Sequence, residues 1–162
     1  MSIDTLDHKI MMQLMENGRS TWSELATLLQ LSAPAVADRV RRLQERGVIQ
    51  GYAAQIEPRA VGLTLLAYVA VTLERPHHRA GFLAWVQQAN AVQECHHIAG
   101  GEGDYLLKVR CRDTADLEDL VSNQIKGLEG IVRSRTTIVL STVKETSRLP
   151  LPDFSLEQSD SS

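Results

Sequence analysis

Four arginines gather between residues 32 and 47 of this 162-residue chain, where only two acidic residues accompany them. The arginines are Arg39, Arg41, Arg42 and Arg46. A guanidinium group can form paired hydrogen bonds with phosphate oxygens and with the O6 and N7 atoms of guanine. The stretch therefore indicates nucleic-acid binding. The alternative is a solvated helix face on which Asp38 pairs with Arg41 or Arg42 at helical spacing.

Residues 100–104, with the sequence Gly-Gly-Glu-Gly-Asp, suggest a different chemistry. Glycines expose backbone N–H groups, which can bind a ligand carboxylate, while an acidic side chain can bind an ammonium group. This combination suits a zwitterionic amino acid. A plain glycine-rich hairpin turn is the alternative that the residues alone leave open.

Two histidine-rich stretches, His77-His78 and Cys95-His96-His97, raise the question of a metal site. Zinc needs about four converging ligands. On a strand, Cys95 and His97 would share one face while His96 points away. We therefore expect no metal, and structural or surface roles for these histidines.

The two cysteines, Cys95 and Cys111, are equally distant in sequence from Gly103, so they could lie opposite each other across a hairpin. We expect small core residues in a reducing compartment, with a redox switch as the alternative. The chain contains no nucleophile motif, phosphate-binding loop or dinucleotide fingerprint. These observations predict a protein that is not an enzyme and that holds no cofactor.

The arginine-rich stretch follows two predicted helices. The first begins after the capping residue Asp4 and ends before Gly18, which readily adopts the left-handed conformation at a helix end. The second covers residues 22–29, behind a capping box formed by Thr21 and Glu24. Its inward-facing residues are predicted to be Leu25, Leu28 and Leu29.

A third helix should begin after the capping residue Ser32 and end before Gly47, with Pro34 in its first turn. Its buried stripe is formed by Val36, Val40 and Leu43. Residues 48–54 then have the pattern of two short strands, a small hairpin or wing. Three helices with a tight turn between the second and third, followed by a hairpin, predict a winged helix-turn-helix.

The face opposite the buried stripe is the expected DNA-binding face. At about 100° per residue, it holds small side chains near the start of the helix and arginines further along. Small side chains allow close approach to base edges, and arginines can contact bases or phosphates. Asp38 would repel phosphate, so we expect it to orient an arginine or to accept a hydrogen bond from cytosine. The predicted DNA contacts are Ser32, Pro34, Ala35, Asp38, Arg39, Arg41 and Arg42.

The second half alternates strands and helices. Strands are expected over residues 65–74, 92–99, 105–111 and 131–143, and helices over residues 78–89 and 114–128. This βαββαβ order is that of a ferredoxin-like domain, in which two helices cover one face of an antiparallel sheet. We predict an α+β chain with three parts. They are a winged helix-turn-helix in residues 1–60, a ferredoxin-like, ACT-like effector-binding and oligomerisation domain in residues 61–145, and a flexible tail in residues 146–162.

The first strand of this sheet is apolar on both faces. Because two helices can cover only one face, the other face needs a partner. We predict a homodimer that packs through the sheet, and its two-fold symmetry would suit a palindromic DNA site. The alternative is that the linker or the tail covers this face.

The net charge of −3 does not exclude a nucleic-acid partner, because the charge is unevenly distributed. Residues 1–60 carry seven Lys or Arg and seven Asp or Glu, so the acidic excess lies in the second half. No apolar run approaches the ~18 residues that a membrane span needs. The first residues lack the pattern of a signal peptide. We therefore expect a cytoplasmic protein with no membrane partner.

Several short motifs occur in an order and spacing that resemble those of the feast/famine, or Lrp/AsnC, regulators. In the first half they are Asp7-x-Lys9-Ile10, Glu16-Asn17-Gly18-Arg19, Glu24-Leu25-Ala26, Leu31-Ser32, Arg39-Val40-x-Arg42-Leu43 and Gly47-Val48-Ile49-x-Gly51-Tyr52. In the second half they are Gly101-x-x-Asp104-Tyr105-Leu106-Leu107-Lys108-Val109 and Gly130-Ile131-Val132, followed by Thr136, Val139-Leu140 and Val143-Lys144. The resemblance covers residues 3–145.

The resemblance implies a transcription regulator that binds double-stranded DNA, forms dimers that assemble further to tetramers or octamers, and responds to an amino acid or a related metabolite. It places the effector contacts at Gly101, Glu102, Asp104, Ser134 and Thr136. Siroheme decarboxylases resemble the same family, so a siroheme-decarboxylase-like enzyme is the alternative function. Its tetrapyrrole pocket would have only His96, His97 and Arg110 as candidate lining residues.

Overall fold

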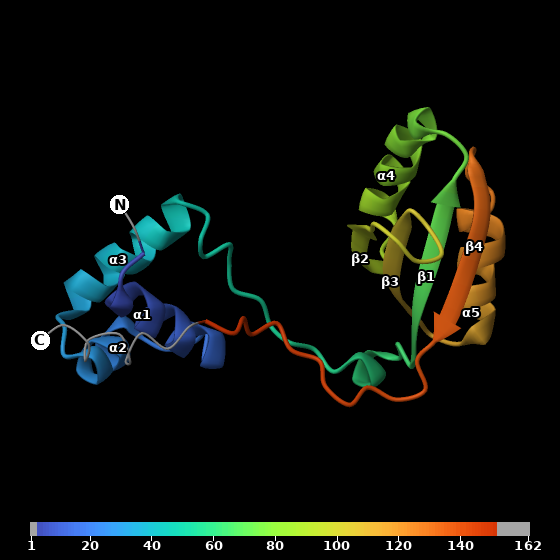
Figure 1. Ribbon diagram of the computed structural model, residues 1–162. Coiled ribbons are helices and arrows are strands. Elements are labelled where there is room, and N and C mark those ends of the chain that lie inside the picture. The colour runs from blue at the N-terminus through green and yellow to red at the C-terminus, as the bar shows by residue number, and fades with distance from the viewer. Residues whose placement is uncertain (1–2, 152–162) are drawn as a thin grey trace, which may run out of the picture. The chain divides into compact units, whose positions relative to one another are not determined.

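The computed structural model describes residues 3–151 and divides into two compact units (Figure 1). Of these residues, 3–55 and 145–151 belong to one unit, and Ile56–Lys144 form the other. Most of the tail predicted for residues 146–162 lies outside the described residues. Its described part, residues 146–151, contains no helix or strand.

The first unit contains three helices, α1 (Thr5–Glu16), α2 (Trp22–Leu29) and α3 (Ala33–Glu45). Each begins where the sequence predicts, because the side chain before it accepts a hydrogen bond from a backbone N–H group of the first turn. The capping residues are Asp4, Thr21 and Ser32. The predicted helix-turn-helix is therefore confirmed.

Apolar residues from all three helices form the core of this unit. They are Ile10, Leu14, Leu25, Ala26, Val36 and Val40. Leu28, which was expected to face inward, is instead 58% exposed. Leu25, Ala26 and the partly buried Leu29 share one side of α2, and Leu28 lies about 100° of helix rotation from the centre of that stripe.

The segment after α3 does not form the predicted hairpin. Gly47 has a φ of 68°, and the N–H groups of Val48 and Ile49 both donate to the carbonyl of Leu43, at 2.9 and 3.2 Å. These two N–H groups cap α3 and are not available for strand pairing. Residues 46–57 contain no strand, so the expectation of two strands within residues 48–54 is wrong.

The second unit contains a four-stranded sheet in the order β2-β3-β1-β4, with every neighbouring pair antiparallel. Its elements are η1 (Pro58–Val61), β1 (Leu65–Leu73), η2 (Pro76–His78), α4 (Arg79–Gln88), β2 (Val92–His97), β3 (Tyr105–Cys111), α5 (Thr114–Asp119), η3 (Leu120–Ile125) and β4 (Ile131–Ile138). This order confirms the predicted βαββαβ fold, and Figure 1 shows its two helices beside the sheet.

The core of the second unit lies between the helices and one face of the sheet. Every second residue of β1 and β3 faces it, as the pleat of a strand requires. The strand residues in this core are Ala67, Val69, Val71, Tyr105, Leu107, Val109 and Cys111, and the helices add Phe82, Val86, Leu117, Leu120 and Ile125. Among the elements of this unit that the structure describes, both helices pack on that one face of the sheet.

Two elements of the second unit differ from their predicted lengths. The helix expected over residues 114–128 is α-helical only to Asp119 and continues as the wider π-helical turn η3. The strand expected to reach Val143 ends at Ile138. Since β1 begins at Leu65 and pairs Ala67 with Ile138, it provides no partner for residues 141–143.

Candidate functional site

The exposed face of α3 is determined by its buried stripe. The stripe is the predicted one, at most 1% exposed: Val36, Val40 and Leu43. At the start of the helix, Ser32 Oγ accepts a hydrogen bond from the N–H of Ala35 at 3.3 Å. Pro34 is exposed in the first turn, where it lacks no helical hydrogen bond. The small residues predicted to contact DNA therefore lie together at one end of α3.

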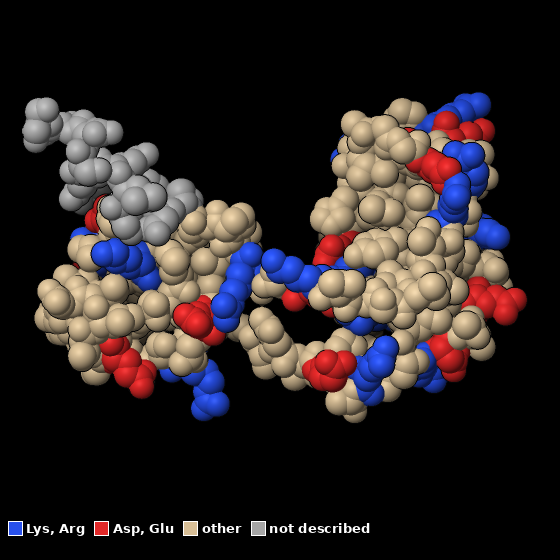
Figure 2. Space-filling view, turned by 60° about the horizontal axis from the view of Figure 1, so that its bottom comes forward, with Lys and Arg blue, Asp and Glu red and all other residues tan. Residues whose placement is uncertain are grey.

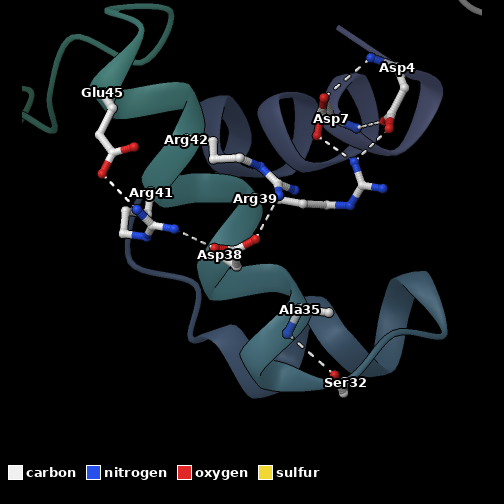
Figure 3. A network of polar contacts seen from close by, with 9 residues as sticks. All are labelled: Asp4, Asp7, Ser32, Ala35, Asp38, Arg39, Arg41, Arg42 and Glu45. Atoms are coloured by element: carbon white, nitrogen blue, oxygen red, sulfur yellow. Dashed lines mark hydrogen bonds and ion pairs between the residues drawn. The ribbon is translucent and has the colours of Figure 1, made fainter. Parts of the chain in front are cut away.

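Three further predicted contacts form a network with Glu45 on the exposed side of α3 (Figure 3). Asp38 Oδ1 lies 2.6 Å from Arg41 Nη2, and Asp38 Oδ2 lies 2.7 Å from Arg42 Nη1. On its other side, Arg41 Nη1 lies 2.7 Å from Glu45 Oε1. The hydrogen bond from Arg41, together with the charges of the neighbouring arginines, holds the pKa of Asp38 below its ordinary value. Asp38 is therefore a carboxylate at neutral pH.

Arg39 has a different environment from the other predicted contacts. Its Nη1 atom lies 2.6 Å from Asp4 Oδ2 and 2.7 Å from Asp7 Oδ1, so its guanidinium group joins α3 to α1 (Figure 3). The side chains of Arg39 and Asp7 are only 21% and 12% exposed. Partial burial would raise the pKa of Asp4, but hydrogen bonds from the Asp7 N–H and from Arg39 outweigh it and lower that pKa. The partner carboxylates, 32 and 35 residues away in sequence, were not foreseen.

Charges of both signs therefore lie close together around α3. In the network on its exposed side, two carboxylates balance the guanidinium groups of Arg41 and Arg42. Figure 2 likewise shows acidic and basic side chains interspersed on the face of the molecule in view. The candidate DNA-binding face thus contains arginines that already have anionic partners.

The glycine-rich loop between β2 and β3 lies against the end of β1. Asp104 Oδ2 accepts a hydrogen bond from the Leu73 N–H at 2.7 Å, and the Asp104 N–H donates to the Val71 carbonyl at 2.8 Å. At Gly103, a Cβ atom would lie 2.8 Å from the Val71 carbonyl oxygen, so only glycine fits there. Gly101 has a φ of 93°, a conformation that also favours glycine.

The structure brings Glu102 close to two arginines of β4. The Glu102 carboxylate pairs with Arg135, and its carbonyl accepts a hydrogen bond from Arg133 Nη2 at 3.1 Å. These two arginines were not among the predicted site residues, although their i, i+2 spacing on a strand would place both on one face.

Ser134 and Thr136, the two effector contacts predicted on β4, face the other side of the sheet. They lie opposite Val71 and Val69, so their side chains are on the helix-covered face. Ser134 Oγ is buried and has no hydrogen-bond partner among the residues that the structure describes. The predicted effector residues thus divide into a loop group, with Glu102 and Asp104, and a strand group under the helices.

The cysteines occupy different positions in the β2–β3 hairpin from those considered in the sequence analysis. Cys95 pairs with Leu107, and Cys111 pairs with Leu65 of β1, so the two thiols do not face each other. The hairpin is centred on Gly101, since His97 pairs with Tyr105 and Cys95 with Leu107, and not on Gly103 as the equal spacing of the cysteines had suggested. Burial and two nearby carboxylates raise the pKa of Cys111 to about 11. Within residues 3–151, no three or more His, Cys, Asp or Glu side chains form a group that could hold a metal ion.

Comparison with known proteins assigns a class to each unit. A winged helix-turn-helix DNA-binding domain matches residues 3–50, and the Lrp/AsnC ligand binding domain matches residues 66–149. The chain therefore combines a DNA-binding domain with a ligand-binding domain, as in a transcriptional regulator. None of the helices in the described part of the chain is long and apolar enough to cross a membrane.

Individual relatives agree with this class. The HTH-type transcriptional regulator LrpA of Mycobacterium tuberculosis is 43% identical over 141 residues, which cover 87% of this chain and 92% of that protein. A transcriptional regulator from Neisseria meningitidis, solved in complex with L-methionine, matches with a TM-score of 0.87 and 31% identity, covering 92% of this chain and 97% of that one. A feast or famine regulatory protein from M. tuberculosis, also complexed with L-methionine, has a TM-score of 0.84 and 40% identity, covering 91% and 99%.

The chain belongs to the Lrp/AsnC family and is a DNA-binding transcriptional regulator. The resemblance noted from the sequence motifs is therefore confirmed. Because the curated relatives are regulators and not enzymes, the siroheme-decarboxylase alternative is not supported.

Proposed function

We propose that this regulator reads double-stranded DNA with the exposed face of α3. The observation that carries this proposal is the position of Arg41 and Arg42, 60% and 43% exposed, on the side of α3 away from its buried stripe. Arg39 is assigned a positioning role, because its guanidinium group is engaged by Asp4 and Asp7. The DNA contacts proposed are Ser32, Pro34, Ala35, Asp38, Arg41 and Arg42.

The test begins with genome-wide mapping of the sites that the regulator occupies. Fluorescence anisotropy with a duplex carrying a mapped site should then give an affinity about 10³-fold or more above that for a random duplex at the same salt concentration. A purified chain that ignores duplex DNA even at low salt contradicts the proposal. A protein that binds chromosomal DNA of bacteria acts in the cytoplasm, which is the location we assign.

The face of the sheet opposite α4 and α5 is proposed to form a homodimer interface. Tyr68, Ala70 and Leu106 lie on this face and are partly buried, with the ion pair between Lys108 and Glu94 at its edge. An apolar centre with a charged edge is the usual composition of a protein–protein interface. Dimers with two α3 helices could bind the two halves of a palindromic site, and further assembly to tetramers or octamers would extend this arrangement.

Light scattering after size-exclusion chromatography should give at least twice the 18.0 kDa mass of one chain at micromolar concentration. Ala70→Arg should reduce the mass to that of a monomer, because it places a second positive charge beside Arg135 on the face that would be buried. Glu118→Arg, on the exposed surface of α5, is the control and should leave the mass unchanged. A monomeric wild-type chain at this concentration would rule out the homodimer.

The second unit is proposed to bind an amino acid as effector, in keeping with its match to a ligand binding domain. The contacts proposed are Gly101, Glu102, Asp104, Ser134 and Thr136. In the loop group, backbone N–H groups would bind the carboxylate of the ligand, and the Oδ1 atom of Asp104 would accept a hydrogen bond from its ammonium group. The L-methionine complexes of similar proteins support this class of ligand.

Asp104→Asn should abolish effector binding while leaving DNA binding intact. Asparagine keeps an oxygen that can accept the hydrogen bond from the Leu73 N–H, so the loop should retain its structure, but the negative charge for the ammonium group is lost. Calorimetric titration of wild type and variant with each of the twenty amino acids measures the effect, with Glu118→Gln as the charge-matched control. No heat from any amino acid with the wild type would count against this ligand class.

Effector binding is proposed to act by linkage with DNA binding and assembly. An amino acid that binds more tightly to one assembly or to one arrangement of the DNA-binding domains shifts the population toward it. DNA affinity then changes by no more than this difference in effector affinity, and DNA must alter effector affinity by the same factor.

A further inference from the structure

The network on the exposed side of α3 carries an inference that rests on the proposed function and extends it. We propose that Asp38, assisted by Glu45, determines specificity by competing with DNA phosphates for Arg41 and Arg42. The carboxylates occupy the guanidinium groups in the free protein. On random DNA this competition weakens binding, whereas at a correct site paired contacts to bases replace the lost carboxylate contacts.

The geometry supports this competition because both oxygens of one carboxylate are used. Asp38 lies one helical turn before Arg41 and Arg42, at the i+3 and i+4 positions, and its two oxygens lie 2.6 and 2.7 Å from them. Glu45 lies one turn beyond Arg41 and contacts its other terminal nitrogen at 2.7 Å. Arg41 is thus held between two carboxylates, and Figure 3 shows this chain of contacts along α3.

The exposure of these groups keeps the competition reversible. The side chains of Arg41, Arg42, Asp38 and Glu45 are between 43% and 60% exposed. A single exposed ion pair changes a binding equilibrium, here that between the arginine and DNA, by about fivefold at most. A phosphate that displaces Asp38 gains little, because it exchanges one anionic partner of the arginine for another and must approach the remaining carboxylate. A guanine edge, which carries no net charge, can accept two hydrogen bonds from the same guanidinium group.

Arg39, unlike Arg41 and Arg42, does not take part in this competition. Its carboxylate partners belong to α1, and the group is only 21% exposed, so it is not available for exchange with DNA. The competition is therefore assigned to Asp38 and Glu45 alone. Asp38 contacts two arginines and Glu45 only one, which predicts a larger effect for Asp38.

The experiment compares wild type with Asp38→Asn, Glu45→Gln and the control Asp116→Asn. Asp116 on α5 forms an i, i+4 pair with the exposed Arg112, which precedes that helix, so its substitution makes the same charge change and also releases an arginine. Affinity for a mapped duplex and for a random duplex is measured by anisotropy at several salt concentrations, with circular dichroism to check folding.

Asp38→Asn should bind the random duplex about three- to tenfold more tightly, and the slope of log K against log salt should steepen by about 0.9 for each arginine that gains a phosphate. The affinity for the mapped site should rise less or fall, so the specificity ratio decreases. Glu45→Gln should have the same effect with a smaller magnitude, and Asp116→Asn should have none.

A folded Asp38→Asn variant with unchanged or weaker random binding and an unchanged salt slope overturns the inference. An equal increase for Asp116→Asn overturns it as well, since net charge would then be the cause. These outcomes differ from failure of the proposed function, in which the wild type itself does not prefer the mapped duplex.

Discussion

Replacing Arg42 by alanine should weaken binding to a mapped site by about 1–3 kcal/mol, or roughly 5- to 150-fold. Arg42 follows the small residues at the start of α3 by two helical turns, on the face away from the core. Its guanidinium group is held by Asp38 at 2.7 Å, so it is partly ordered before DNA arrives. A bidentate contact to one base is expected to account for the loss. Anisotropy titrations of both proteins with the mapped duplex measure it.

Arg112→Ala, in the turn between β3 and α5, provides the control, because it removes the same charge from a residue that is not proposed to touch DNA. Its affinity for the mapped duplex should match that of the wild type. A loss for Arg42→Ala that is small and equal on mapped and random duplexes would contradict base reading by this residue and indicate a phosphate contact.

Arg39→Ala should destabilise the first unit by about 2 kcal/mol, a value reduced from that of a fully buried ion pair because the group is partly exposed. The substitution leaves the carboxylates of Asp4 and Asp7 side by side without their cation, and Asp7 is buried. The melting temperature of this unit should fall by roughly 8–16 °C. Fluorescence of Trp22 on α2, in a background with Trp85→Phe, follows unfolding of this unit.

The effect of Arg39→Ala should depend on pH in a defined direction. The pKa of Asp4 is lowered in the folded protein, so its contribution to stability is present above the unfolded pKa and is lost as the pH falls through the folded pKa. Removal of Arg39 removes part of this contribution, and the difference between the proteins should shrink below about pH 4. A variant as stable as the wild type but defective in DNA binding would instead make Arg39 a DNA contact.

Local sequence signals predicted the helices of the DNA-binding unit well. Asp4, Thr21 and Ser32 cap their helices because each cap involves residues within one turn. The pairing of Asp38 with Arg41 or Arg42 was also foreseeable, since i+3 and i+4 neighbours meet on a helix. The sequence signal for Leu28 was weaker, because three leucines within five residues leave the centre of the stripe uncertain.

Contacts between distant parts of the chain could not be predicted in the same way. The partners of Arg39 depend on how α1 packs against α3, which no local pattern encodes. The positions of Cys95 and Cys111 depend on where the β2–β3 hairpin turns, which is at Gly101 and not at Gly103. The pattern of residues 48–54 likewise did not reveal that the first of their N–H groups cap α3. The spacing of apolar residues was enough to predict the order of helices and strands. The register of the strands and the ion pairs between distant helices could be seen only in the structure.

Photocrosslinking from α3 tests most directly whether this helix lies in the DNA groove. A benzophenone amino acid at position 34 replaces the exposed Pro34 in the first turn of α3, and the same group at exposed Glu118 on α5 is the control. With a mapped duplex bound, we predict crosslinks from position 34 to bases within the site and none from position 118. A stable complex that crosslinks from position 118 and not from position 34 would contradict DNA reading by α3.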